Sequence, residues 1–254
     1  MNAALRIDLN CDAGESFGAW SLGDDDALFT VVTSANIACG YHAGDPSTME
    51  STVRSAVRHG VAIGAHPSYP DLEGFGRRSM RVSQAEAEAF VLYQIGALQA
   101  VARANGGSVT HVKPHGALYN DAARDIALAR AIASAVRRSG DLRLVGLAGS
   151  AFVDAASSAG VTFVAEGFCD RTYGDDGHLI SRSIAGALIT DPSTAARQAV
   201  DIAVNGRVRS ASGASVAVAA ESLCIHGDTP GAIDIARAVR AALEAAGVRI
   251  ASPG

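Results

Sequence analysis

The sequence predicts an α/β fold in which seven parallel strands close into a (β/α) barrel, and three observations support it. Short apolar runs alternate with longer amphipathic segments, as in chains built from βα units. Several of the short runs consist almost entirely of Val, Ile, Leu and Ala, which is typical of parallel strands buried on both faces. Ionisable and amide residues gather where most of these runs end, and a (β/α) barrel carries its functional groups at that end.

The seven expected strands, in chain order, are 5–11, 34–39, 61–66, 109–115, 142–148, 161–168 and 216–226. Helices are expected between them. Ser47 with Glu50, and Ser83 with Glu86, have the spacing of a capping box, and Asp228 with Pro230 suits a cap and a first turn. No G-x-G-x-x-G follows the first strand, so a closed barrel is favoured over an open doubly wound sheet.

Composition sets the size and class of the protein. The chain has 254 residues, 48% of them hydrophobic, without an evident linker or repeat, so residues 1–254 are expected to form one domain. A net charge of −5 without a basic stripe, and only 5% aromatic residues, argue against nucleic-acid and anionic-membrane partners.

No apolar run is long enough to cross a bilayer, and the first residues lack a signal-peptide pattern, so a cytoplasmic location is expected. The four cysteines form no C-x-x-C pair and are expected to be buried and free.

Polar side chains alternate along the first expected strand, in "IDLNCDAGES" (7–16). Asp8, Asn10 and Asp12 share one face, which we expect to look into the barrel mouth. Buried carboxylates are costly unless a cation or several donors meet them. Lys113 and His115 have equal parity in "KPHG" and are expected to point inward, with Pro114 marking the end of the strand or a bulge.

Four of the seven histidines, His42, His66, His115 and His226, each end a different expected strand. Such a set indicates either a divalent-metal site or a proton-transfer site. Asp12, His42 and His66 would make an open metal site. By contrast, His59 is expected at an exposed helix end, His111 in the core, and His178 has no assigned role.

Two loops carry further candidates. In "GFGRRS" (74–79), Arg77 or Arg78 can clamp a carboxylate or phosphate. The stretch 169–190 is long for a βα connection, and such loops often act as lids. The sequence contains no G-x-x-x-x-G-K-[ST] phosphate loop and no G-x-S-x-G elbow.

Six motifs, in family order across residues 8–232, resemble those of the LamB/YcsF family, the A subunits of 5-oxoprolinase. They are "DLNCDAGES", "ANIACGYHAGDP", "IGAHPSYPDLEGFGRR", "VKPHGALYN", "AEGFCDRTYGDDG" and "LCIHGDTPGA". Cys169, and Gly167 before Phe168, depart from the family pattern without removing an ionisable group. The resemblance implies a seven-stranded barrel similar to polysaccharide deacetylase and glycoside hydrolase barrels. It also implies ATP-dependent opening of 5-oxo-L-proline (pyroglutamate) to L-glutamate, with subunits B and C of the same enzyme as partners.

The individual roles are our own interpretation of that chemistry. Asp12 is the expected general base, with His115 as the alternative acid or base, and Lys113 is expected to stabilise negative charge on the reacting oxygen. His42 and His66, with Asp45 as a further candidate, would hold a metal or orient the base. Contacts to substrate are expected from Asp8, Asn10, Glu15, Arg77, Glu166, Asp170, His226 and Asp228.

ATP with magnesium is the implied co-substrate. Because the chain has no phosphate loop, either it binds ATP through an unfamiliar set of donors or phosphorylation takes place on the partner subunits, and the second is preferred. Two other functions stay open. One is a metal-dependent deacetylase or carbohydrate hydrolase, against which the single Trp and five Tyr argue. The other is a non-catalytic subunit that presents pyroglutamate to its partners.

Overall fold

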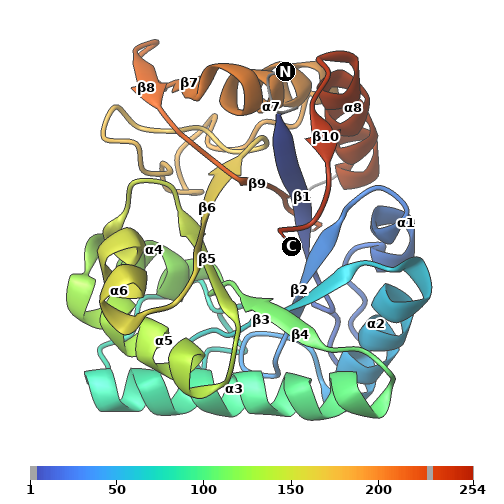
Figure 1. Ribbon diagram of the computed structural model, residues 1–254, viewed down its shortest axis with the longest axis vertical. Helices are drawn as coiled ribbons and strands as arrows, with labels where there is room; N and C mark the ends of the chain where they lie inside the picture. Colours follow the sequence, from blue (N-terminus) through green and yellow to red (C-terminus); the bar gives the residue numbers. More distant parts are fainter. Residues whose placement is uncertain (1–4, 228–230, 254) are drawn as a thin grey trace.

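A closed barrel of seven parallel strands forms the centre of the molecule, as predicted. The computed structural model describes residues 5–227 and 231–253. The barrel strands are β1 (Arg6–Ala13), β2 (Ser34–Ala38), β3 (Ala62–His66), β4 (Val109–Val112), β5 (Arg143–Leu147), β6 (Phe163–Phe168) and β9 (Ser222–Ile225). Each pairs with the next, and β1 pairs with both β2 and β9, which closes the sheet (Figure 1).

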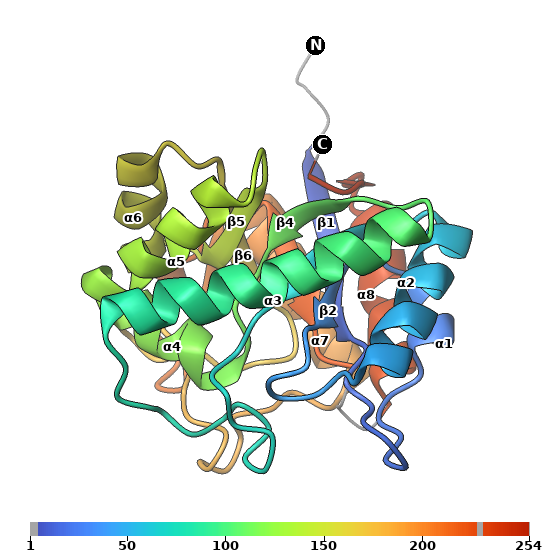
Figure 2. The same ribbon diagram turned by 90° about the horizontal axis from the view of Figure 1, so that it is seen from below.

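Helices surround the barrel and bury apolar faces against it. They are α1 (Asp25–Phe29), α2 (Pro46–His59), α3 (Gln84–Ala104), α4 (Gly116–Arg124), α5 (Ile126–Arg138), α6 (Ala151–Ala159), α7 (Pro192–Asn205) and α8 (Ala232–Ala245). The 21-residue α3 is the longest of these described helices and lies across β3 and β4 (Figure 2). No helix among residues 5–227 and 231–253 is both long and apolar enough to cross a membrane.

The expected strand 216–226 is wrong as one strand. Its first part forms β8 (Ser215–Ala217), which pairs antiparallel with β7 (Arg207–Arg209) in a separate two-stranded sheet. Only β9 enters the barrel. The apolar run misled because β8 is largely exposed and only β9 is buried in the barrel, and hydrophobicity along the sequence does not distinguish them. A short strand that was not predicted, β10 (Arg249–Ile250), pairs with the first residues of β1.

Helix starts agree with the sequence in one case and differ in another. Ser83 and Glu86 form the predicted capping box at the start of α3. Ser47 does not cap α2; Asp45 does, and its carboxylate accepts the backbone N–H groups of Ser47 and Thr48. Asp45 precedes Pro46 at the first helical position, where a missing N–H costs nothing. The predicted start at Asp228 and Pro230 lies outside the described residues.

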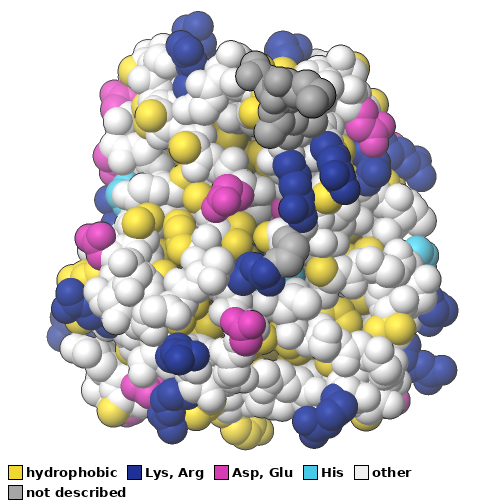
Figure 3. Space-filling model, in the orientation of Figure 1, with side chains coloured by type: hydrophobic (Ala, Val, Ile, Leu, Met, Phe, Trp, Pro, Cys, Tyr) yellow, Lys and Arg dark blue, Asp and Glu magenta, His cyan; other side chains and the backbone are white. Residues whose placement is uncertain are grey.

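The two ends of the barrel differ in character. Long loops hang from the end at which the strands finish, at the bottom of Figure 2. Figure 3 shows the opposite face, where β1 begins, and there basic, acidic and hydrophobic side chains are interspersed. Because the long loops lie at the end at which the strands finish, that end holds the candidate site.

All four cysteines are buried and free, as expected.

Candidate functional site

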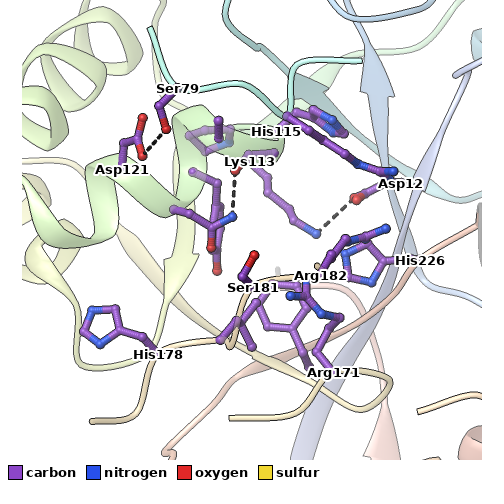
Figure 4. A pocket seen from close by; sticks show the side chains of 18 of the residues that line it. Asp12, Ser79, Lys113, His115, Asp121, Arg171, His178, Ser181, Arg182 and His226 are labelled. Atoms are coloured by element: carbon purple, nitrogen blue, oxygen red, sulfur yellow. Dashed lines mark hydrogen bonds and ion pairs between the residues drawn. The ribbon is translucent and has the colours of Figure 1, made fainter. Parts of the chain in front are cut away.

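A pocket of about 430 Å³ opens at the C-terminal ends of the strands. Its floor comes from the ends of β1 and β3 and from Lys113 just after β4. One wall comes from α4 and the loop after β3, and the opposite wall comes from the 169–190 segment (Figure 4). The polar and charged residues that line it are Asp12, His66, Arg77, Ser79, Lys113, His115, Tyr119, Asn120, Asp121, Arg124, Arg171, His178, Ser181, Arg182 and His226.

Lys113 lies at the pocket floor and is buried, with its ammonium group among acceptors. The Nζ atom is 3.0 Å from Asp12 Oδ1 (Figure 4). It is 2.9 Å from Glu166 Oε1. It also donates to Asn10 Oδ1 at 3.2 Å and lies 2.9 Å from Cys224 Sγ. Burial alone would lower the pKa of Lys113, but the surrounding negative groups, Asp12 first, raise it well above its ordinary value. The lysine is therefore a fixed cation.

Asp12 is ionised for the complementary reason. Burial acts to raise its pKa, but neighbouring His66 and Lys113 hold that pKa well below the ordinary value. Asp12 Oδ2 lies 3.4 Å from His66 Nε2. A buried carboxylate facing the pocket next to a fixed ammonium is suited to accept a proton or to polarise a water molecule.

The other polar residues of β1, Asp8 and Asn10, lie deeper in the barrel and form hydrogen bonds with side chains of neighbouring elements. Asn10 donates to Glu166 and to Ser222, and Tyr119 donates to the other oxygen of Glu166 at 2.8 Å. Asp8 accepts from hydroxyl groups of Thr33, Ser34 and Ser222. The predicted common face of β1 does point into the barrel, but Asp8, Asn10 and Glu166 are not among the residues that line the pocket. They support Lys113 and Asp12 from below.

Four side chains form a second cluster beside the first: Glu15, His42, His66 and His115, all buried. His115 Nδ1 lies 3.0 Å from His66 Nε2 and 3.3 Å from Glu15 Oε1. His42 Nε2 lies 3.2 Å from the same carboxylate oxygen. Burial lowers the pKa of His42 and of His115 well below the ordinary value, so these two rings are neutral.

Close approach of two loops places His115. Gly76, in "GFGRRS", adopts a positive φ of 64°, and its carbonyl accepts the N–H of Ala117 at 2.8 Å. A Cβ at Gly76 would collide with Ser68 Oγ and lie 2.9 Å from His115 Cδ2. The Phe75 carbonyl accepts His115 Nε2–H at 2.9 Å. These glycine-rich turns therefore allow the loop after β3 to fix a ring that follows β4.

The 169–190 segment forms a wall of the pocket and carries basic groups. Arg171, Arg182 and Arg77 all line the cavity. Arg171 is buried and donates to the carbonyls of Ile180 and Ala187, which ties the segment to itself. Burial and then the like charge of Arg182 lower the pKa of Arg171 to about 10. Basic side chains gathered in this way favour an anionic ligand.

Among residues 5–227 and 231–253, two groups of residues have donor atoms close enough to hold one metal ion. One is Glu15, His42, His66 and His115, and the other is Asp12, Cys224 and His226. The expected set of Asp12, His42 and His66 is therefore divided between them, although Asp12 and His66 are in contact. Asp45 belongs to neither group, because its carboxylate caps α2 at the surface.

The remaining predicted residues lie at several depths. Arg77 and His226 line the pocket, whereas Asp170 lies behind His226 and bonds to its backbone N–H and its Nδ1. Arg78 points away and pairs with Asp71. Asp228 lies outside the described residues.

Sequence reasoning missed several lining residues, among them Tyr119, Asp121, Arg171, His178 and Arg182. Three of them lie in the 169–190 segment, whose length was the signal that could have found them.

Known proteins resemble the whole chain. The model of the LamB/YcsF family matches residues 7–254. A Bordetella pertussis protein named as the A subunit of 5-oxoprolinase is 56% identical over 251 residues, which are 98% of this chain and 99% of that protein. The Chloroflexus aggregans protein of the same name is 54% identical over 250 residues, with 98% and 99% covered. The crystal structure of a lactam utilization protein from Thermus thermophilus superposes with a TM-score of 0.91 at 51% identity, covering 97% of this chain and 99% of that one.

Proposed function

This chain belongs to the LamB/YcsF family, and from that premise we propose that it is the subunit of a 5-oxoprolinase in which the ring of 5-oxo-L-proline is opened to L-glutamate. The observation that carries the proposal is the ionised Asp12 beside the fixed cation Lys113 on the floor of a pocket with basic walls. Its volume of about 430 Å³ admits a small ligand with one carboxylate.

Asp12 is the proposed general base. A lactam is a stabilised amide and a poor electrophile, so we propose that transfer of a phosphoryl group from ATP to the lactam oxygen activates the ring carbon. Asp12 takes a proton from a water molecule whose oxygen adds to that carbon. The ring carbon–nitrogen bond breaks, and the nitrogen takes the proton from Asp12 and leaves as the amine. A second water molecule hydrolyses the remaining acyl phosphate, which releases the second carboxylate and phosphate.

Lys113 supports this step by its charge. Its described contacts with Asp12, Glu166, Asn10 and Cys224 already occupy the ammonium group, so its main effect is to keep Asp12 ionised. The thiol of Cys224 is the weakest of these partners, and a reacting oxygen would replace it with the least loss. His115 is the alternative acid or base, and Arg77 on the wall is the proposed partner of the substrate carboxylate.

The co-substrate and the partners complete the proposal. ATP with magnesium supplies the phosphoryl group, and we place that step on subunits B and C because the sequence carries no phosphate loop. Substrate contacts from His226 and Asp228 also belong to this proposal, whereas Glu15 and Asp170 do not line the pocket and act through the histidines that they contact. Asp8, Asn10 and Glu166 act on the substrate only through Lys113 and Asp12.

The test measures glutamate release from 5-oxo-L-proline by this chain alone and with subunits B and C, with and without ATP. Release that needs this chain, its partners and ATP is expected. Asp12→Asn should lower the rate by at least about tenfold, since general-base catalysis contributes about 10²–10⁴-fold. Arg58→Met, which removes an exposed ion pair with Asp26 on the helical surface, is the control and should leave the rate unchanged.

Two outcomes would redirect the proposal. Release without ATP, or activity on N-acetyl sugars, would favour the metal-dependent hydrolase, for which the Glu15 and histidine cluster is the supporting observation. A wild-type rate in Asp12→Asn, with partner binding intact, would favour a subunit that only presents the substrate.

A further inference from the structure

Two histidines at the pocket, His66 and His115, each direct one ring nitrogen toward the other. His66 Nδ1 lies 2.6 Å from the Lys113 carbonyl oxygen, so this nitrogen carries the proton and donates it. His115 Nε2 likewise donates to the Phe75 carbonyl at 2.9 Å. The ring nitrogens that remain, His66 Nε2 and His115 Nδ1, face each other 3.0 Å apart.

Carboxylates flank this pair on both sides. Glu15 Oε1 lies 3.3 Å from His115 Nδ1, and Asp12 Oδ2 lies 3.4 Å from His66 Nε2. A single added proton does not satisfy all these contacts. If the proton is on His66 Nε2, then His115 Nδ1 and Glu15 Oε1 face each other as two acceptors. If it is on His115 Nδ1, then His66 Nε2 and Asp12 Oδ2 face each other as two acceptors.

We propose that Glu15, His66 and His115 bind one divalent metal ion of the zinc class at the edge of the pocket. Ligand atoms of a tetrahedral ion with bonds of about 2.0–2.1 Å lie about 3.3 Å apart. The distances of 3.0 Å between the two nitrogens and 3.3 Å between His115 and Glu15 match that spacing. Imidazole nitrogen with a carboxylate suits zinc, cobalt or nickel better than magnesium or calcium.

Backbone carbonyls give this set the arrangement of a prepared metal centre. A ligating histidine usually donates its other ring N–H to a carbonyl or carboxylate, which fixes its tautomer and direction. Both His66 and His115 do so. The two rings also stand almost perpendicular, with an interplanar angle of 87°, so their lone pairs approach one point from different directions.

His42 is a positioning residue in this proposal and not a third imidazole ligand. Its ring stacks on His115 with an interplanar angle of 5° and centroids 3.8 Å apart. Parallel stacked rings cannot both direct in-plane lone pairs at one ion. His42 Nε2 instead lies 3.2 Å from Glu15 Oε1, where its N–H can hold the carboxylate.

The neighbouring group of Asp12, Cys224 and His226 is a weaker candidate because a cation already serves it. The ammonium of Lys113 lies 3.0 Å from Asp12 and 2.9 Å from Cys224.

The proposed site opens to the pocket. Its three ligands, Glu15, His66 and His115, leave a fourth position for water, and the two histidines line the pocket. A metal ion bound by these three residues would lie next to Asp12, where it would make a bound water more acidic.

The test measures binding of zinc and cobalt by the purified full chain, without substrate or partners, so that its outcome does not depend on the proposed reaction. After removal of metal with a chelator, we expect about one equivalent of zinc per chain by elemental analysis, and a visible cobalt spectrum of low coordination number. Competition with a chromophoric chelator gives the affinity. His66→Ala, His115→Ala and Glu15→Gln should each lose at least about 100-fold in affinity, because each removes a direct ligand.

Two further variants separate a ligand from a structural role. His42→Ala should weaken zinc by only about 10–100-fold, the usual effect of a residue that orients a ligand. His115→Cys offers a thiolate and should restore cobalt binding with a thiolate charge-transfer band, even where the alanine variant folds poorly. His59→Ala, at the exposed end of α2, is the control and should bind as the wild type does.

Failure of the wild-type chain to bind zinc or cobalt stoichiometrically would overturn the proposal and assign a shared proton to the histidine pair. Stoichiometric binding that the His66 and His115 variants leave unchanged would overturn it as well.

Discussion

The two polar clusters at the mouth of the barrel differ in where their positive charge comes from. Around Lys113, the chain supplies its own cation, and the ammonium lies within 3.2 Å of two carboxylates and an amide oxygen. Around His66 and His115, backbone carbonyls accept a hydrogen bond from one nitrogen of each ring, and the other two nitrogens face each other 3.0 Å apart. The first cluster carries its own cation, whereas the second, in our proposal, binds a metal ion.

This difference assigns separate tasks to adjoining residues. A buried ion pair that satisfies itself holds charges in place, at a desolvation cost that makes it a weak source of net stability. A set of preoriented acceptors binds a ligand with little rearrangement. Asp12 connects the two clusters, since it contacts Lys113 through one oxygen and His66 through the other.

The largest expected effect comes from breaking the self-sufficient cluster. Lys113→Met removes the ammonium and leaves Asp12 and Glu166 as buried carboxylates without their cation, which should lower the free energy of unfolding by about 3–5 kcal/mol. The loss should shrink at lower pH, because Asp12 without the ammonium of Lys113 has a higher pKa and takes up a proton. Urea denaturation at pH 8 and pH 5 measures both effects.

Arg58→Met is the matched control for that variant, because it breaks an ion pair whose side chains are 60% and 67% exposed. It should change the free energy of unfolding by less than about 1 kcal/mol. Equal losses in the two variants would show that the Lys113 cluster is not the buried ion network described above.

Crowding the loop that holds His115 should have the next largest effect. Gly76→Ala puts a Cβ against Ser68 and His115 at a positive φ of 64°. We expect a loss of about 2–4 kcal/mol, from a left-handed backbone and an overpacked site, together with weaker zinc binding. Gly106→Ala has a similar φ of 76° and no atom within 4 Å of the added Cβ, so it reports the backbone cost alone, about 1–2 kcal/mol. Similar stability and similar zinc affinity in the two variants would contradict the placement of His115 by Gly76.

A smaller effect should appear in the pH dependence of stability. Burial and then the charge of Lys113 lower the pKa of His111 from 6.5 to about 3. Below pH 6.5 the unfolded chain therefore binds a proton that the folded chain excludes, so this histidine reduces stability as the pH falls from 6.5 towards 3. Between pH 7 and pH 5 it should account for about 2 kcal/mol of the decline. His111→Gln should remove that part, and denaturation midpoints that fall in parallel with those of the wild type would argue against it.

The smallest expected effect separates Asp45 from the metal cluster. Asp45→Ala removes the cap of α2 and its contact with the Gly18 N–H, so the thermal unfolding midpoint should fall slightly. Zinc affinity should not change, because the carboxylate bonds to backbone N–H groups and Thr48 at the surface. Loss of zinc binding in this variant would return Asp45 to the set of ligands.

The sequence by itself determined the barrel and the end at which polar side chains surround a pocket. Nearly continuous apolar runs identify strands buried on both faces, and the alternation of Asp8, Asn10 and Asp12 identifies the face that looks inward. Pro114 correctly marked the end of β4, since it has no N–H to donate to a neighbouring strand. These inferences succeeded because they depend on local periodicity and backbone chemistry.

Only the tertiary structure decided which inward side chains meet. It placed Asp8 and Asn10 below the pocket, grouped Glu15 with three histidines, and gave Asp45 to a helix cap. It also fixed the tautomers of His66 and His115 through the carbonyls of Lys113 and Phe75. Distances between strands, and the carbonyl that each ring faces, follow from barrel closure and loop approach, and residue spacing along one chain does not encode them.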